Sequence, residues 1–462
     1  MRGVLRDADA LQPADHLGYV CTLGVRGGAI SERSQQSFDV SQGYRRYVLG
    51  MLLAVFVVSY IDRQILAILL PPIKEEMNLS DTQLGFLTGF AFAIFYAVMG
   101  IPIGQWADRW NRCNIISICL VLWSLMTAAS GLALNYVHLV LARIGVGVGE
   151  AGTGPCNHSL IADYYPADKR ATAMGVYSLG IPLGALFGIM AGGWINEFFG
   201  WRTAFIAVGL PGVALAIVIK LTVKEPPRGH ADQVADDIDA PNLREVISFL
   251  WASRTFIHLL LGACITGMCY IAVTQWVPSY LSRSFGLGTG EIGTLFAPAV
   301  GIAGGLGTLL SGYMVDKMRP RDLRWQAWIP GAAIFLTIPG VTLACLAPSA
   351  NLAVVYLILP LFFFPMQLAP FSALVQGLVP LRMRSVAVAI SLFISTVIAF
   401  GLGPQVTGIV SDLLEPTYGI ESLRYGILVV AVGGAVWSGI HFLVCAKSIQ
   451  ADQANAAITQ EA

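Results

Sequence analysis

Apolar runs of about 20 residues recur along the chain and alternate with short polar stretches. A helix of that length crosses the roughly 30 Å of hydrocarbon in a bilayer, so each run predicts a membrane-spanning helix. Twelve spans are predicted, at 46–70, 82–104, 113–134, 136–159, 171–196, 202–223, 254–281, 291–314, 327–347, 351–376, 385–410 and 425–446. The pattern therefore favours an all-α integral membrane protein.

The longest polar stretch between spans, residues 224–253, sets the expected domain organisation, because it separates six spans from six. We expect one bundle over 44–223 and a second over 254–447, joined by this stretch as a linker. Residues 1–43 lack the apolar core of a signal peptide and are expected to be a flexible tail or an overextended start of the reading frame. Residues 448–462 are the expected C-terminal tail.

Lysine and arginine positions predict the orientation of the spans. Eighteen basic residues near the spans fall on the side of the termini and the linker, and four fall on the other side: Lys74, Arg202, Arg283 and Arg424. Since such residues concentrate in cytoplasmic loops, both termini are expected inside the cell, with the protein in the plasma membrane.

Composition agrees with a membrane protein. The chain is 56% hydrophobic and 12% charged, against about 25% charged residues in a soluble domain, and its mean hydropathy is +0.68. A formal net charge of zero suggests no nucleic-acid partner. Eight scattered cysteines and six histidines show no ligand spacing, so no metal or cofactor is expected. The sequence contains neither a nucleophile elbow nor a phosphate-binding loop, the motifs that would indicate an enzyme.

Four charged residues interrupt predicted spans of the first half: Asp62, Arg63, Arg143 and Glu150. Each charge near a bilayer centre costs roughly 2.5–3.5 kcal/mol, so such groups pair or line a wet cavity and mark function. Arg143 and Glu150 are seven residues apart and share one helix face, about 10 Å from each other. Glycines around them make this helix thin, which lets a neighbour approach closely.

The depth of these charges along their spans predicts how they pair. Asp62, Arg63 and Arg143 lie at similar depth, and Glu150 lies one to two turns deeper, so Arg143–Asp62 and Arg63–Glu150 are both plausible pairs. A pair 4 Å apart gains about 4 kcal/mol at an effective dielectric near 20, enough to keep the acid ionised. A small movement would weaken the pair and release the acid for protonation. A static salt bridge that only fixes packing is the alternative.

The second-half spans carry no clear charge at mid-depth and instead offer polar aromatic residues among many apolar ones. A cavity between the halves would be charged on one wall and apolar on the other, which suits an amphipathic substrate. Tyr270 and Trp276 are the candidate contacts on the apolar wall, although single aromatic residues are more often packed core.

A loop sequence repeats between the halves. GQWADRWNR stands between spans 2 and 3, and GYMVDKMR stands between spans 8 and 9, with Asp108 and Asp316 separated by 208 positions. Pro-x3-Arg precedes both span 5 and span 11, ending at Arg170 and Arg384. Two echoes at nearly one offset indicate duplication of a six-span unit, a plan known among transporters. The loop arginines can pair with Asp163 or Asp168.

The first loop resembles the loop 2–3 signature of the major facilitator superfamily, and the second copy and the six-plus-six layout agree with it. The resemblance covers about residues 44–447. It implies two six-helix bundles about a central cavity, alternating access, and a cytoplasmic gate. Carried onto matching positions, the gate residues are Asp108, Arg109, Arg112 and Arg170, with Asp316 and Arg384 as second-half counterparts.

Further stretches resemble Spinster-type transporters, namely DRQILAILLPPIKEEMNLSDTQLGFL, GVGEA and IADYYPADKR. The resemblance implies a secondary transporter of a lysolipid or sphingoid substrate that is coupled to protons. Asp62 and Glu150 would couple protons, and Arg63, Arg143 and Glu150 would bind substrate. The expected partners are the bilayer, a small amphipathic substrate and protons, with the protein as a monomer. Competing hypotheses are a symporter or exporter of small organic anions or drugs, and a passive scramblase.

Overall fold

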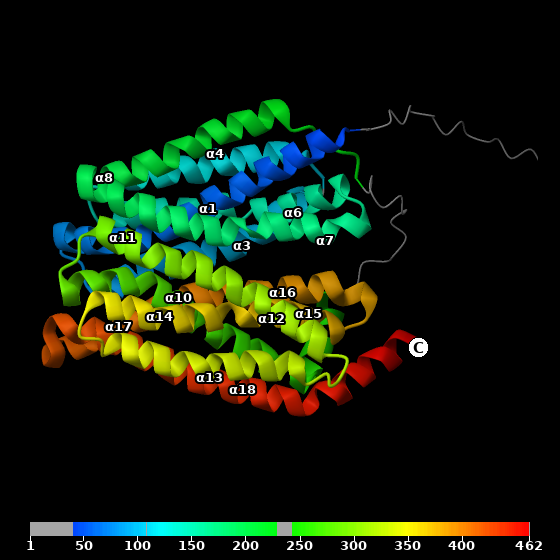
Figure 1. Ribbon diagram of the computed structural model, residues 1–462. Coiled ribbons are helices and arrows are strands. Elements are labelled where there is room, and N and C mark those ends of the chain that lie inside the picture. Colours follow the sequence, from blue (N-terminus) through cyan, green and yellow to red (C-terminus); the bar gives the residue numbers. More distant parts are fainter. Residues whose placement is uncertain (1–39, 108, 229–242, 462) are drawn as a thin grey trace, which may run out of the picture. The chain divides into compact units, whose positions relative to one another are not determined.

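The apolar runs form long helices, and polar residues between them cap the helix ends. The computed structural model describes residues 40–107, 109–228 and 243–461, and every regular element in these ranges is helical (Figure 1). Residues Val40–Ala462 form one compact unit. Nearly all of the predicted tail 1–43, and residues 229–242 of the predicted linker, lie outside the described residues.

The first bundle is built from eight helical segments. They are α1 (Gln42–Met77), α2 (Asp81–Thr88), α3 (Phe90–Ala107), α4 (Arg112–Ser130), α5 (Tyr136–Glu150), α6 (Thr153–Tyr164), α7 (Ala167–Ser178) and α8 (Gly180–Thr222). The second bundle follows the short helix α9 (Leu243–Ala252).

The second bundle is interrupted more often by π and 3-10 turns. Its elements are α10 (Arg254–Phe285), α11 (Thr289–Pro298), η1 (Ala299–Ala303), α12 (Gly304–Met318), α13 (Trp325–Cys345), α14 (Ala350–Phe363), η2 (Phe364–Gln367), α15 (Leu368–Gly377), η3 (Leu381–Met383), α16 (Arg384–Thr396), η4 (Val397–Leu402), α17 (Gly403–Tyr418), η5 (Gly419–Glu421) and α18 (Ser422–Glu461).

The number of membrane crossings follows from these bounds. Nine stretches of the described chain are long and apolar enough to span a membrane. Two of these stretches each reverse direction once, at Gly200 and at Gly419, where φ is positive at 81° and 56°. Consecutive α5 and α6 add one crossing that is broken at Gly152. The predicted twelve-span all-α fold is confirmed.

The predicted thinness of α5 sets how the charged residues are packed. A Cβ atom on Gly149 would lie 2.7 Å from the Trp123 main-chain nitrogen of α4. A Cβ atom on Gly147 would lie 2.7 Å from the Phe92 carbonyl oxygen of α3. Glycine at these positions therefore lets α5 lie directly against both neighbours and brings Arg143 and Glu150 close to α1.

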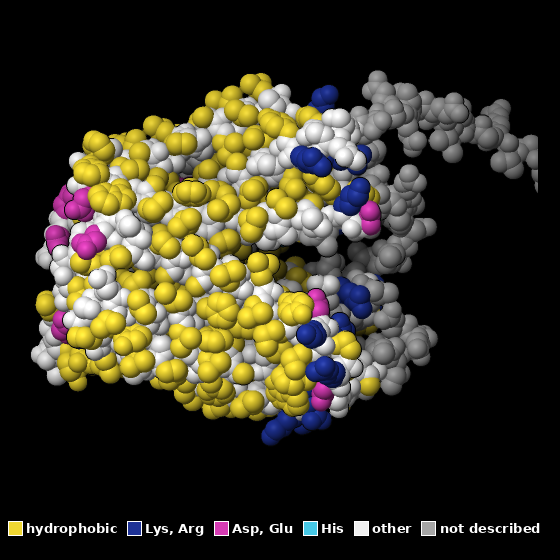
Figure 2. Space-filling view, viewed as in Figure 1, with side chains coloured by type: hydrophobic (Ala, Val, Ile, Leu, Met, Phe, Trp, Pro, Cys, Tyr) yellow, Lys and Arg dark blue, Asp and Glu magenta, His cyan; other side chains and the backbone are white. Residues whose placement is uncertain are grey.

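The two ends of the bundles differ in charge and in closure. Lysine and arginine side chains gather at the end where α1 begins and α18 ends, which we call the basic end, and a hydrophobic belt covers the middle (Figure 2). The surface is hollowed between the bundles at the basic end (Figure 2). We call this hollow the central cleft.

Side chains of both bundles close the opposite end. Arg283 of α10 donates to both carboxylate oxygens of Asp81 in α2, at 2.7 and 2.6 Å. Lys74 pairs with the same carboxylate at 2.6 Å. The Asp412 carboxylate of α17 accepts from the main-chain nitrogens of Asp81 and Thr82, at 2.9 and 2.7 Å. This carboxylate caps the start of α2 from the other bundle, and we call these five residues the clasp.

Candidate functional site

The Arg63–Glu150 pair expected from the sequence is formed. The Arg63 Nε lies 2.6 Å from Glu150 Oε2, with side-chain exposures of 9% and 0%. Ser59, one turn before Arg63 on α1, donates to the same oxygen at 2.9 Å. Two buried donors on α1 therefore hold one carboxylate oxygen of α5, while Glu150 Oε1 has no hydrogen-bond partner in the described chain.

Aromatic rings surround the Arg63 guanidinium. Its Cζ lies 5.1 Å from the ring centre of Tyr60, 4.9 Å from Phe92, 4.8 Å from Tyr96 and 5.7 Å from Phe400. Phe400 belongs to η4 of the second bundle, so the cage joins both halves. Each ring face stabilises a cation, most strongly where water is excluded. The aromatic cage therefore holds the Arg63 charge, and the terminal N–H groups of the guanidinium remain available as donors.

Arg143 contacts the main chain of Asp62, whereas the depth along the spans predicts an ion pair with its carboxylate. Its Nη1 donates to the main-chain carbonyl of Asp62 at 3.3 Å, and no ion pair joins the two side chains. The guanidinium also lies 5.4 Å from the Phe92 ring centre. Arg143 is 3% exposed, so its charge is held by a backbone dipole and an aromatic face.

The Asp62 carboxyl is fully buried and faces α4. Thr127 and Trp123 on α4 are side-chain donors close to it. Neither carboxyl oxygen has a hydrogen-bond partner of good geometry among the described residues. The four predicted intramembrane charges are thus brought together, but Asp62 and Arg63 face different surroundings.

The two aromatic candidates of the second bundle differ in position. Trp276 is fully buried, and its indole N–H donates to the Pro404 carbonyl at 3.0 Å, so it packs inside the second bundle. Tyr270 is half-buried, lies 6.2 Å from the Phe364 ring and comes near Tyr60 of the first bundle. Tyr270 therefore lies toward the first bundle, whereas Trp276 packs within the second.

The first loop of the repeat is firmly paired at Arg112. This side chain is 1% exposed, binds Asp163 as expected from the sequence, and lies 2.6 Å from Glu225 Oε1. Sequence reasoning missed Glu225, which follows α8. Arg170 donates to the Ala162 carbonyl at 2.9 Å, and Arg109 is exposed. Asp108 lies outside the described residues.

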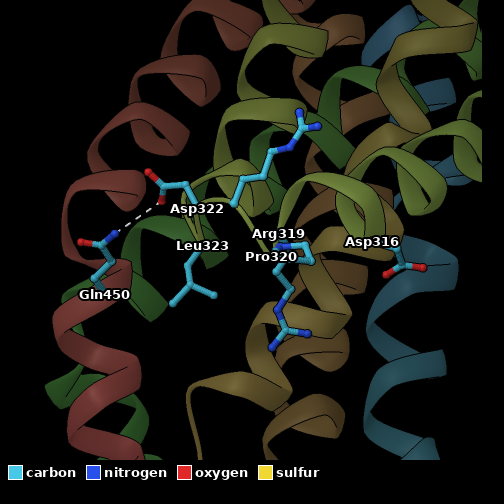
Figure 3. Close-up of a pocket in the computed structure, with 7 residues that line it drawn as sticks. Asp316, Arg319, Pro320, Asp322, Leu323 and Gln450 are labelled. Carbon is cyan, nitrogen blue, oxygen red and sulfur yellow. Dashed lines mark hydrogen bonds between the residues drawn. The ribbon is translucent and has the colours of Figure 1, made fainter.

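The second loop of the repeat is open. A pocket of about 490 Å³ lies beside it (Figure 3). Its lining residues are Asp316, Arg319, Pro320, Arg321, Asp322, Leu323 and Gln450. Asp322 accepts from Gln450 at 3.4 Å, whereas Asp316 lies on the other side of Arg319 (Figure 3). Asp316 is exposed, and the Arg384 Nε has no partner in the described part of the chain. The counterpart gate residues are therefore not joined as Arg112 is.

No cluster of three or more potential metal ligands occurs among the described residues. The first bundle holds buried charges, and the second bundle meets it at one end and is separated from it by a hollow at the other (Figure 2). This arrangement is typical of a membrane transporter rather than an enzyme.

Comparisons with known proteins identify the family. Residues 52–404 match the Major Facilitator Superfamily, and the chain belongs to it. The chain is 33% identical over 401 residues to an MFS-type efflux pump of Mycolicibacterium smegmatis, covering 86% of this chain and 92% of that protein. It is 29% identical over 386 residues to the "Probable L-galactonate transporter" of Escherichia coli K12, covering 79% and 83%.

A solved structure supports a Spinster-like transporter within this superfamily. It is the crystal structure of a bacterial homolog of the human lysosomal transporter Spinster in an inward-facing, unoccupied conformation. The TM-score is 0.78 at 30% sequence identity, with 90% of this chain and 98% of that chain covered.

Proposed function

We propose that the protein is a secondary active transporter that moves an amphipathic, lipid-like substrate by alternating access, coupled to protons. The substrate class is a lysophospholipid or a sphingoid phosphate, with an anionic head and an apolar tail. The observation that carries the proposal is the Arg63 guanidinium inside four aromatic rings drawn from both bundles.

The Arg63 guanidinium can bind an anionic head group. Among the described residues its one hydrogen bond leaves from Nε to Glu150. The terminal nitrogens remain for a phosphate or carboxylate, which a guanidinium binds through two parallel charge-assisted hydrogen bonds. An arriving anion would compete with Glu150 for Arg63 and would release the Glu150 carboxylate from it. Substrate binding would therefore act on proton coupling through this pair.

The surroundings of Arg63 favour a lipid-like substrate over a sugar acid. A polyhydroxy acid needs several polar partners, because each hydroxyl buried without a hydrogen bond costs free energy. The cage offers two phenol groups, Tyr60 and Tyr96, and two phenyl rings. The second-bundle wall adds Tyr270 beside Phe364. This lining suits an apolar tail.

The second candidate is a transporter of small organic anions or drugs. The galactonate transporter and the efflux pump among the relatives favour it, and Arg63 would serve a sugar carboxylate equally well.

The remaining assignments complete the proposal. Asp62 and Glu150 carry the proton, and Arg143 supports both. Arg109, Arg112 and Arg170, with Asp108, form the cytoplasmic gate, and Asp316 and Arg384 are its second-half counterparts. The basic end faces the cytoplasm by the charge rule. The bundles span 44–223 and 254–447, with 224–253 as a cytoplasmic linker, and the protein acts as a monomer in the plasma membrane.

The test is a ligand panel read by thermal unfolding of the purified protein. A ligand that binds the folded state at 100 times its dissociation constant stabilises it by about 2.7 kcal/mol. Oleoyl-lysophosphatidylglycerol should raise the melting temperature of wild type and of Arg321→Gln, a control at an exposed arginine. Arg63→Gln should lose the response. A response to L-galactonate but not to the lysolipid would support the second candidate instead.

A further inference from the structure

The neighbours Asp62 and Arg63 face different environments because successive residues on a helix are turned by about 100°. Arg63 reaches the aromatic cage, which includes Phe400 of the second bundle. Asp62 is turned toward α4, where it faces Thr127 and Trp123. Asp62, one of the two proton-carrying acids of the proposed function, therefore lies in a compartment of its own.

Four polar atoms of this compartment have no hydrogen-bond partner among the described residues. They are both carboxyl oxygens of Asp62, the indole Nε1 of Trp123 and the hydroxyl Oγ1 of Thr127. The exposed fractions of the three residues are 0%, 0% and 2%. Buried donors and acceptors are nearly always paired in native proteins, so unpaired donors facing an unpaired acceptor need an explanation.

The explanation lies in the two charge states of the acid. A buried ionised carboxylate without hydrogen bonds is strongly disfavoured, whereas the neutral acid is tolerated. Rotation of the Thr127 hydroxyl and a small shift of the Trp123 ring would bring two donors onto the carboxylate once its proton has left. We propose that Trp123 and Thr127 are positioning residues that hold the ionised carboxylate of Asp62 and thereby set the proton affinity of the coupling site.

The charged groups around Asp62 come from two helices. On α5, Arg143 donates to the Asp62 carbonyl, and Glu150 is engaged by Arg63 of α1. Helix α4 presents Thr127 and Trp123 without a charge, and α8 meets α1 here through Gly188. Thr127 and Trp123 are therefore the side-chain hydrogen-bond donors that substitution can remove without changing any charge.

The experiment measures protonation of Asp62 directly, so it needs no substrate. Infrared difference spectra of the full protein in nanodiscs are recorded during a pH titration, and the carbonyl stretch of a protonated carboxylic acid is followed. Loss of the band in Asp62→Asn assigns it. In Thr127→Val and in Trp123→Phe the band should persist to higher pH, with its midpoint raised by about one unit, a tenfold change in proton affinity. The band should also change frequency.

Two further variants separate positioning from general damage. Thr127→Ser keeps the hydroxyl and should restore the wild-type midpoint. Ser130→Ala removes a buried hydroxyl of the same helix that is bonded to the Met126 carbonyl, and it should leave the Asp62 band unchanged. The inference is overturned if Thr127→Val and Trp123→Phe titrate like Ser130→Ala. The inference rests on Asp62 as the coupling acid of the proposed function. If the Asp62 band responds as described but transport does not respond to a pH gradient, the proposed coupling is refuted and the positioning role of Trp123 and Thr127 stands.

Discussion

Removing Arg283 from the clasp should shift the protein away from the conformation in which the basic end is open. Arg283 crosses from α10 to α2 and donates two hydrogen bonds to Asp81, with side-chain exposures of 16% and 2%. Hydrogen bonds to charged groups contribute about 1.5–3 kcal/mol each, and Lys74 remains to satisfy Asp81. Because Lys74 and Ser411 still bind Asp81, we expect Arg283→Gln to cost this conformation the equivalent of about one such bond, about 2 kcal/mol, a shift of about 30-fold in its equilibrium.

Distances between spin labels at the basic end measure the shift. Labels at the exposed positions Lys169 of α7 and Arg321 of the second bundle should show a larger short-distance population in Arg283→Gln than in wild type. Arg202→Gln is the matched control, because Arg202 binds Glu76 at 2.6 Å within the first bundle. Equal distance distributions in Arg283→Gln, Arg202→Gln and wild type would refute the role of the clasp.

Three further outcomes are expected. Asp62→Asn should abolish the response of proteoliposome uptake to an imposed pH gradient; a wild-type response would remove Asp62 from coupling. Gly149→Ala should lower the free energy of unfolding in denaturant by about 1–3 kcal/mol, because its Cβ would lie 2.7 Å from the Trp123 main-chain nitrogen. Gly154→Ala is the control, because no atom lies within 4 Å of a Cβ at that position. Glu225→Gln should lower the melting temperature, because Arg112 is 1% exposed and loses one of its two carboxylate partners; no change would show that Asp163 alone suffices.

Helix content and pair depth could be predicted because both follow from spacing along one chain. A 20-residue apolar run gives a span, and counting residues gives depth. Counting cannot give the rotation of one helix about its axis relative to a neighbour. The expected Arg63–Glu150 pair therefore formed, whereas Arg143, predicted at the right depth, reached the main chain of Asp62 instead of its carboxyl group.

Contacts between distant segments could not be predicted from the apolar runs or from residue spacing. The clasp joins Asp81 to Arg283 and Asp412, which are 202 and 331 positions away. Phe400 enters the Arg63 cage through an interrupted helix of the other bundle. Such contacts depend on how the two bundles are arranged, and a transporter adopts more than one arrangement with the same sequence.

The arrangement of the charges gives a physical reason for placing substrate and proton in separate compartments. An anion bound directly beside an ionised Asp62 would repel it, and at a dielectric near 20 two like charges 4 Å apart cost about 4 kcal/mol. Because Asp62 faces α4 while Arg63 faces the cage, that repulsion is reduced. Glu150 touches Arg63 on one side and leaves Oε1 unbonded. A substrate that displaces Glu150 from Arg63 would therefore change the field at Asp62 without contacting it, and coupling would pass through one mobile carboxylate.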